Sequence, residues 1–196
     1  MLDFHSHILP GVDDGSDSPE QSVAMLKEEA KQGIRCVIAT PHFYPQRESV
    51  ESFLKRREAA RTVLWEAMAR QEGLPELLMG AEVFYYTGMS DSPDLRKLAI
   101  EGTNCILVEM PDGEWTPRMY RELEKIALQQ GLTPIVAHID RYIRPWRTRG
   151  IPQRLAALPV LVQANGKFFL NRKTRPLAMK LLKKGYIHLL GSDAIT

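Results

Sequence analysis

The stretch MLDFHSHILPGVDDG, residues 1–15, leads from a short apolar segment into two histidines, a Pro-Gly turn and two aspartates. Side chains two residues apart on a strand point to the same face, so we expect His5 and His7 to project side by side. Paired imidazoles with carboxylates nearby, here Asp13 and Asp14, suit a hard or borderline divalent cation. Taken alone, the stretch favours a pair of metal ligands but is also compatible with two ordinary surface histidines, so the rest of the chain has to decide.

Strand-like and helix-like segments alternate along the 196 residues. After the N-terminal strand, apolar runs of strand length lie at 36–40, 77–81, 105–108, 134–137, 160–163 and 187–190. Helices are predicted at 18–33, 48–72, 117–130, 152–158 and 176–184, with a short one near 95–100. The alternation predicts an α/β fold of βα units with a mainly parallel sheet or barrel. Because no linker or repeat divides the chain, we expect a single domain over residues 1–196.

Histidines and carboxylates recur where these predicted strands end. Because the C-terminal ends of parallel strands meet at one rim of a barrel, such side chains are expected to converge there. Any one of them would ordinarily be a surface group or a helix cap, but the repetition favours a metal site. Mixed nitrogen and oxygen ligands suit manganese, iron or zinc. The residues concerned are His5, His7, His42, Glu82, Glu109, His138 and Asp193.

The charge is unevenly distributed. Residues 1–113 carry 11 Lys/Arg against 19 Asp/Glu, whereas residues 114–196 carry 15 against 5. The basic half could steer an acidic or phosphorylated substrate, or could simply consist of solvated helix faces. Since no nucleic-acid-binding motif accompanies the basic residues, we expect no nucleic acid partner.

The composition is that of a soluble cytoplasmic protein, with 44% apolar and 26% charged residues. No run approaches the ~20 apolar residues that span a bilayer, and the start lacks the features of a signal peptide. Cys36 and Cys105 lie in apolar strand-like runs, as buried reduced thiols do, and there is no C-x-x-C motif. We therefore expect a cytoplasmic location.

Several motifs resemble those of the PHP (polymerase and histidinol phosphatase) superfamily: His5-Ser6-His7, Asp14, Thr40-Pro41-His42, Gly80-Ala81-Glu82, Val108-Glu109, the segment from Ala137 to Tyr142, and Gly191-Ser192-Asp193-Ala194. More narrowly, HSHILPGVDDG, ATPHFYP, GAEVFY and PIVAHIDRY resemble the CpsB/YwqE-type bacterial protein-tyrosine phosphatases of capsule and exopolysaccharide synthesis. The resemblance runs from residue 1 to the end of the chain, in matching order and spacing.

This resemblance implies a PHP-type distorted (β/α)7 barrel with two or three divalent ions, most commonly Mn²⁺, with Fe or Zn as alternatives. The implied activity is hydrolysis, by metal-activated water, of phosphotyrosine on the tail of a bacterial tyrosine kinase. Such an enzyme would be peripheral to the membrane kinase without inserting into the membrane, and is compatible with an oligomer. Arg141 would be the catalytic, substrate-binding residue that holds the phosphate. The implied metal ligands are His5, His7, Asp14, His42, Glu82, Glu109, His138 and Asp193.

The chain departs from the family pattern at three places. Asp140 replaces the usual glutamate of the AH-(I/P)-E-R-Y motif. The last motif of the family, Asp-x-His, reads Asp193-Ala194-Ile195 here, and isoleucine cannot bind a metal, which leaves full three-metal occupancy open. The relatives continue with a further helix and a loop that bears another phosphate-binding arginine, so we expect an abbreviated C-terminal part and a partly open barrel.

Two alternative functions stay open. One is a PHP phosphatase of a small phosphate monoester such as histidinol phosphate, although HILPGVDDG and AHIDRY are closer to the tyrosine phosphatases. The other is a degenerate, non-catalytic PHP domain that binds phosphotyrosine tails, which Ile195 would favour. An acidic tail could dock on a basic stretch made of Arg141, Arg144, Arg147, Arg149 and Arg154.

Overall fold

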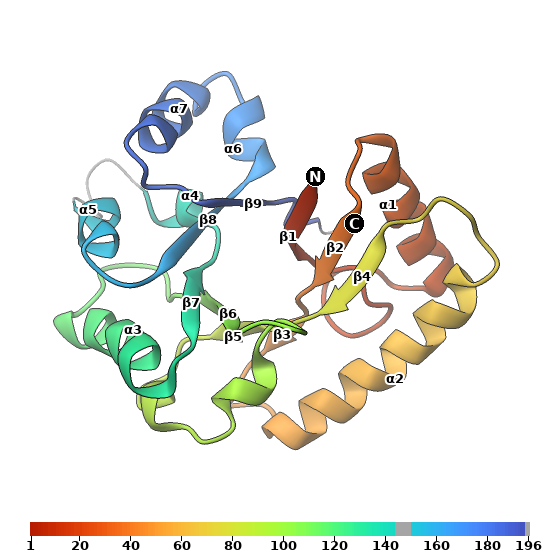
Figure 1. The fold of residues 1–196 in the computed structure, drawn as a ribbon, viewed down its shortest axis with the longest axis horizontal. Coiled ribbons are helices and arrows are strands. Elements are labelled where there is room, and N and C mark those ends of the chain that lie inside the picture. Colours follow the sequence, from red (N-terminus) through yellow and green to blue (C-terminus); the bar gives the residue numbers. More distant parts are fainter. Residues whose placement is uncertain (144–149, 195–196) are drawn as a thin grey trace.

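A curled parallel sheet surrounded by helices makes up the fold (Figure 1), which is known from a computed structural model that describes residues 1–143 and 150–194. The hydrogen-bonded strand orders are β1-β2-β4 and β3-β5-β6-β7-β8-β9, and the neighbouring strands in both orders are parallel. The strands are β1 (Leu2–Ser6), β2 (Cys36–Ala39), β3 (His42–Phe43), β4 (Glu76–Met79), β5 (Glu82–Phe84), β6 (Cys105–Glu109), β7 (Thr133–Val136), β8 (Leu161–Asn165) and β9 (Leu189–Gly191). The expectation of an α/β fold with a parallel sheet is thus confirmed.

The chain passes from the three-stranded sheet into the six-stranded sheet at two short breaks, one after β2 and one after β4. Between β2 and β3 the break contains Pro41, which has no N–H to give to the ladder. Between β4 and β5 it contains Gly80, where an added Cβ would lie only 3.2–3.4 Å from neighbouring side chains. After the breaks, His42 and Glu82 begin β3 and β5 and lie opposite each other in register. The sequence predicted Glu82 just after a strand, whereas it starts a new one.

The last strand lies beside the first (Figure 1). The N–H of Asp193 donates to the carbonyl of His5 at 2.8 Å, and Ser6 forms a parallel bridge with Ala194. Asp3 reinforces the contact, because its carboxylate accepts from the backbone N–H of Ser192 at 2.8 Å and from its hydroxyl at 2.6 Å. The end of β9 is therefore held against β1, which places Asp193 near the histidines.

Substitution of Gly191 by alanine is expected to destabilise the protein by about 1–3 kcal/mol, the usual cost of overpacking a core position. The added Cβ would lie 2.6 Å from the Cβ of His5 and 2.7 Å from Nε2 of Gln163, so β9 must move away from β1. Urea unfolding of the variant measures the loss. A Gly185→Ala variant, at an open turn with φ +72°, is a control for strain without a clash. A Gly191→Ala variant as stable as the unmodified protein would contradict the close packing.

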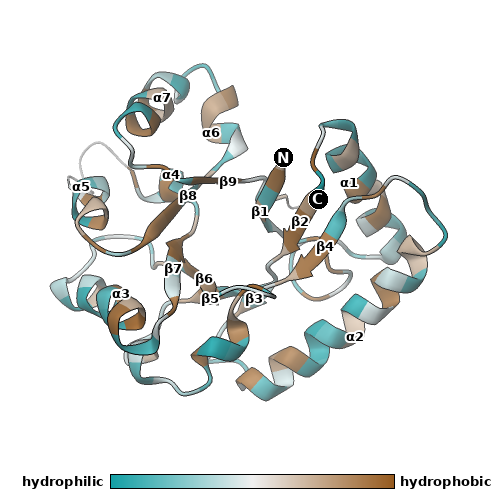
Figure 2. Ribbon diagram, viewed as in Figure 1, coloured by the Kyte–Doolittle hydropathy of each residue, from teal (hydrophilic) through white to brown (hydrophobic). Residues whose placement is uncertain are grey.

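Helices cover the outside of the sheet, with apolar residues facing the strands (Figure 2). The N-cap predicted for the first helix is confirmed, because the Ser18 hydroxyl accepts from the N–H of Gln21 at 3.2 Å. Sequence analysis missed two short helices, α4 and α6. The helices are α1 (Pro19–Lys31), α2 (Val50–Met68), α3 (Pro117–Gln130), α4 (Ile139–Tyr142), α5 (Ile151–Ala156), α6 (Gly166–Leu170) and α7 (Arg175–Lys183), with 3-10 turns η1 (Met89–Asp91) and η2 (Leu95–Leu98).

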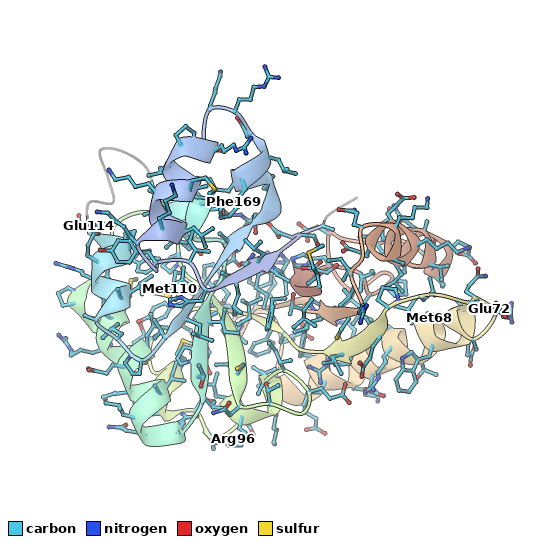
Figure 3. The ribbon with its side chains drawn as sticks, turned by 45° about the horizontal axis from the view of Figure 1, so that its top comes forward. Met68, Glu72, Arg96, Met110, Glu114 and Phe169 are labelled. Carbon is cyan, nitrogen blue, oxygen red and sulfur yellow. The ribbon has the colours of Figure 1, made fainter. Side chains whose placement is uncertain are left out.

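Apolar side chains fill the space between strands and helices. Figure 3 shows Met110 in the interior and Glu72 at the periphery. Among the described residues no helix follows β9, and an apolar cleft of about 930 Å³ lies beside β1 and β9, between α1 and α6. Leu2, Met25 and Leu190 are among its lining residues. None of the helices in the described ranges is long and apolar enough to cross a membrane.

Candidate metal centre

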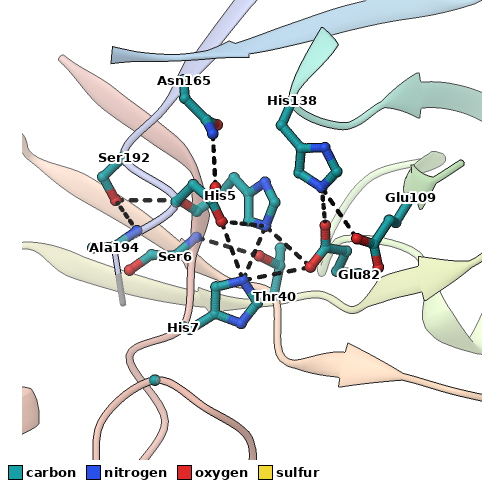
Figure 4. A network of polar contacts seen from close by, with 12 residues as sticks. His5, Ser6, His7, Thr40, Glu82, Glu109, His138, Asn165, Ser192 and Ala194 are labelled. Atoms are coloured by element: carbon teal, nitrogen blue, oxygen red, sulfur yellow. Dashed lines mark hydrogen bonds and ion pairs between the residues drawn. The ribbon is translucent and has the colours of Figure 1, made fainter. Parts of the chain in front are cut away.

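The C-terminal ends of the strands bring the predicted histidines and carboxylates into one cluster (Figure 4). His5 is the fourth residue of β1 and His7 follows that strand, while His42 and Glu82 begin β3 and β5 after the breaks. Glu109 ends β6, and His138 and Asp193 come just after β7 and β9. Every one of these side chains except His42 and Glu109 is buried, and those two are half-buried.

The first group of possible ligand atoms is formed by His5, His7 and Asp193. The two Nε2 atoms of His5 and His7 are only 3.1 Å apart. They lie 3.7 Å and 3.6 Å from the same oxygen, Oδ1 of Asp193. Glu82 also belongs here, because its Oε2 is 3.3 Å from His5 and 3.4 Å from His7. Two imidazole nitrogens at this distance repel unless a proton or a cation lies between them.

A second group consists of Glu82, Glu109 and His138. Nε2 of His138 is 2.7 Å from Oε1 of Glu82 and 3.6 Å from Oε1 of Glu109. His42 lies between the groups, with Nδ1 2.9 Å from Oε2 of Glu82. Glu82 therefore contacts all four histidines and is the central carboxylate of the cluster.

The two aspartates of the first stretch differ in their contacts. Asp14, the expected ligand, is 62% exposed, and its Oδ1 lies 3.5 Å from Nε2 of His42. Asp13 contacts Nδ1 of His7 at 2.7 Å and accepts the N–H of His42 at 3.0 Å. This contact orients the His7 ring so that Nε2 faces the cluster. The sequence indicated Asp13 as a carboxylate near the paired histidines but did not include it among the implied ligands or predict this orienting contact.

Sequence analysis also missed two amides on β8. Oε1 of Gln163 accepts the N–H of His138 at 2.6 Å and lies 3.3 Å from Nδ1 of His5. Nδ2 of Asn165 donates to Oδ2 of Asp193 at 2.7 Å. These side chains hold three members of the cluster in place. Their signal was the pair of amides two residues apart at the end of an otherwise apolar strand.

Arg141 reaches the same rim from α4. Its Nη2 donates to Oδ2 of Asp193 at 2.7 Å, and its Nη1 lies 3.4 Å from Oε1 of Glu109. Asp140, which departs from the family pattern, turns to β8 and accepts the N–H of Asn165 at 2.9 Å. Of the basic stretch, Arg154 lies over the ring of Tyr120 at 5.2 Å. The remaining predictions for this region concern Arg144, Arg147, Arg149 and Ile195, which lie outside the described residues.

The backbone is strained at two of these positions. His138 has φ +29° and Asp193 has φ +49°, both in the region that residues other than glycine rarely adopt. Each is the second residue after a strand, at the rim where the side chains meet. Strained backbone of this kind concentrates at functional sites, where the surrounding contacts maintain it.

Opposing effects set the protonation of the cluster. Burial acts to lower the pKa of His7, but the hydrogen bond with Asp13 and the nearby carboxylates of Asp193 and Glu82 outweigh it and raise the pKa to about 12. Burial and the Glu82 carboxylate raise the pKa of Glu109 to about 7. The pKa of Glu82 is well below its usual range, because the histidines around it outweigh the effect of burial. Without a bound cation, protons held by His7 and Glu109 therefore offset part of the negative charge of the carboxylates.

The residues present fit a divalent metal. Oε2 of Glu82, Oε2 of Glu109 and Oδ1 of Asp193 are buried and have no hydrogen-bond partner among the described residues. The contacts of Glu82 Oε2 with three histidines, at 2.9–3.4 Å, lack the alignment of hydrogen bonds. Buried polar atoms normally have partners, so convergent unpartnered oxygens indicate a cation. Imidazole nitrogens with carboxylate oxygens are a ligand set for manganese, iron or zinc.

Replacement of Asp13 by asparagine is expected to weaken Mn²⁺ binding about 10- to 100-fold, because partners that orient a metal-binding histidine have effects of this size. The variant keeps the shape of the side chain but removes the charge that fixes the His7 ring. Equilibrium dialysis against Mn²⁺ measures the affinity. Asp17→Asn, an exposed aspartate in the same loop, is the matched control. Equal affinities for the two variants would show that Asp13 does not support the site.

Known proteins similar to this chain include tyrosine-protein phosphatases. The family model for capsular polysaccharide synthesis proteins of the CpsB/CapC type matches residues 1–196. The tyrosine-protein phosphatase CpsB of Streptococcus pneumoniae is 27% identical over 208 residues, which cover 98% of this chain and 82% of the relative. The tyrosine-protein phosphatase YwqE of Bacillus subtilis is 28% identical over 204 residues, covering 99% and 77%.

A solved structure shares the fold. It is described as YwqE from Bacillus subtilis and CpsB from Streptococcus pneumoniae, metal-dependent tyrosine phosphatases. It covers all of this chain, and the chain covers 80% of it, with a TM-score of 0.82 and 24% sequence identity. The fold match and the match of the family model over the whole chain agree with the resemblance inferred from the sequence motifs. The chain belongs to the CpsB/CapC family of capsular polysaccharide synthesis proteins.

Proposed function

We propose that this chain is a metal-dependent protein-tyrosine phosphatase that acts in capsular polysaccharide synthesis. Its substrate would be phosphotyrosine on the tail of a bacterial tyrosine kinase, reached from the cytoplasm. The observation that carries the proposal is the convergence of four histidines and three carboxylates with Arg141 at one rim of the sheet. The names of the relatives, which are tyrosine-protein phosphatases, supply the substrate class.

We further infer a PHP-type distorted (β/α)7 barrel over residues 1–196. In this description β2 with β3, and β4 with β5, each count as one strand with a break, and the contact of β9 with β1 closes the ring. The proposed metal ligands are His5, His7, Asp14, His42, Glu82, Glu109, His138 and Asp193, and the proposed metal is manganese.

The chain's own residues position the substrate. A phosphate monoester carries close to two negative charges at neutral pH. Arg141 would hold it, since a guanidinium matches the geometry of phosphate oxygens and its Nη atoms already lie at the rim beside Asp193 and Glu109. When bound, the metal ions would supply Lewis acidity and a water whose pKa is lowered toward ~7.

A cysteine nucleophile is not supported by the geometry. Cys36 begins β2, at the end of the strand away from the metal centre, and burial together with the Glu76 carboxylate raises the pKa of its thiol. A nucleophilic cysteine needs the opposite shift, toward the thiolate. Gln163, Asn165 and Asp13 would serve as positioning residues for the proposed ligands.

Phosphate release from a phosphotyrosine peptide tests the proposal. We expect turnover with added Mn²⁺ and its loss with EDTA, and much slower release from histidinol phosphate. An Ile195→His variant restores the family motif and shows whether the last histidine limits the rate. Chelator-sensitive release only from histidinol phosphate would replace the proposed substrate, and turnover that EDTA does not affect would overturn the metal-dependent mechanism.

A further inference from the structure

A second cation, Lys167, lies at the edge of the metal centre beside Arg141. It belongs to α6, directly after β8, and its side chain is 64% exposed. Its Nζ is 3.7 Å from Oδ2 of Asp193, the same oxygen that receives Nη2 of Arg141. It is neither one of the proposed metal ligands nor one of the positioning residues Asp13, Gln163 and Asn165.

The ammonium group is not required to satisfy Asp193. Oδ2 of Asp193 already accepts from Arg141 and from Asn165, both at 2.7 Å, which uses its two lone pairs. At 3.7 Å, Nζ of Lys167 is beyond hydrogen-bond distance. Among the described residues no acceptor takes any of its three donors. They face solvent next to the rim and are free to bind an incoming anion.

The positions of the two cations are coupled through the backbone. Asp140, the residue before Arg141, accepts the N–H of Asn165 at the end of β8 and so ties α4 to that strand. Lys167 follows two residues later. The departure from the family pattern at Asp140 therefore sits at the contact that joins the two cation-bearing segments.

We propose that Lys167 and Arg141 together bind the phosphate group of the substrate, so that the site selects dianionic phosphate monoesters over monoanionic diesters. The inference rests on the proposed function and adds to it a phosphate-binding residue and a basis for discrimination against diesters. The guanidinium offers a planar pair of donors, while the ammonium is a compact charge with three rotatable donors. A monoester dianion is attracted by both positive charges with twice the charge of a diester monoanion, so the pair of cations favours the monoester.

Inorganic phosphate, a dianion that needs no turnover, is the probe. In the Mn²⁺-loaded protein, titration calorimetry should show that Lys167→Gln weakens phosphate binding about threefold to fivefold, the upper range for a single solvent-exposed charge pair. The KM for p-nitrophenyl phosphate should rise by a similar factor with little change in kcat, and hydrolysis of bis-p-nitrophenyl phosphate should change less than twofold. Lys167→Arg should restore most of the phosphate affinity.

The matched control is Lys173→Gln, which removes an exposed lysine in the loop after α6. Phosphate affinity of the Lys167 variant within twofold of this control would overturn the inference. So would an equal loss of Mn²⁺ affinity and phosphate affinity, because Lys167 would then act by holding Asp193 in position rather than by binding phosphate. If the unmodified protein binds phosphate but releases none from any monoester, the proposed function fails. The phosphate affinities of Lys167→Gln and Lys173→Gln, measured by titration calorimetry, still decide the role of Lys167.

Discussion

Replacement of Glu82 by glutamine is expected to lower phosphatase activity more than 100-fold and to remove measurable Mn²⁺ binding at micromolar concentrations. The expected loss exceeds the ~10- to 100-fold loss for residues that only orient a ligand. Glu82 contacts His5, His7, His42 and His138, so each of the ligand groups around it shares this carboxylate. An amide keeps the shape but loses the charge, and one of its two heteroatoms becomes a donor that cannot bind a cation.

The same variant should also alter the metal-free protein. Glu82 raises the pKa of His5 and His7 against the effect of their burial. Without it, both histidines lose protons at lower pH, which NMR titration of the imidazole carbons can follow. Glu66→Gln, an exposed glutamate on α2, is the control for the loss of one carboxylate. A Glu82→Gln variant that still binds Mn²⁺ as tightly as this control would remove Glu82 from the centre of the site.

Much of this site could be predicted from the sequence because the proposed ligands follow local rules. Buried parallel strands appear as apolar runs, and polar residues at their ends are conspicuous against that background, as with His138 after residues 134–137. Convergence then follows from the common direction of the strands, since C-terminal ends meet at one rim.

The missed features depend on contacts between distant segments. The breaks before His42 and Glu82 arise where Pro41 and Gly80 redirect the strands from one sheet to the other, and a strand of two or three residues has little pattern of its own. Asp13 and Gln163 likewise depend on partners that are distant in the sequence, His42 and His138. Polar side chains such as these have many possible partners in the sequence, and only the fold selects one.

Metal removal is expected to lower the melting temperature, and the size of the effect should depend on pH. A ligand that binds only the folded protein at 100 times its dissociation constant adds about 2.7 kcal/mol of stability. For a chain of this length that corresponds to roughly 5–10 °C. The measurement is thermal unfolding with Mn²⁺ and with EDTA at pH 6 and pH 8, with excess Mn²⁺ added back as the control for reversibility.

The direction of the pH effect follows from the protons that replace the metal. The folded pKa of His7 is raised from 6.5 to about 12, so its contribution to the metal-free protein is complete below pH 6.5 and is lost as pH rises toward 12. Glu109, with its pKa raised from 4.5 to about 7, also favours the folded state at lower pH. His138 opposes both, because burial lowers its pKa and the metal-free fold gains stability as pH rises through 6.5.

Since His5 and His7 both have raised pKa values and Glu109 adds to them, the metal-free protein should melt at a lower temperature at pH 8 than at pH 6. Metal binding expels the same protons and therefore strengthens with pH. The difference between the Mn²⁺ and EDTA melting temperatures should thus be larger at pH 8. An equal difference at both pH values would mean that the cation does not compete with these protons and binds outside the cluster. The Glu82→Gln variant gives an independent test. If its melting temperature differs between Mn²⁺ and EDTA as much as that of the unmodified protein, the cation binds outside the cluster.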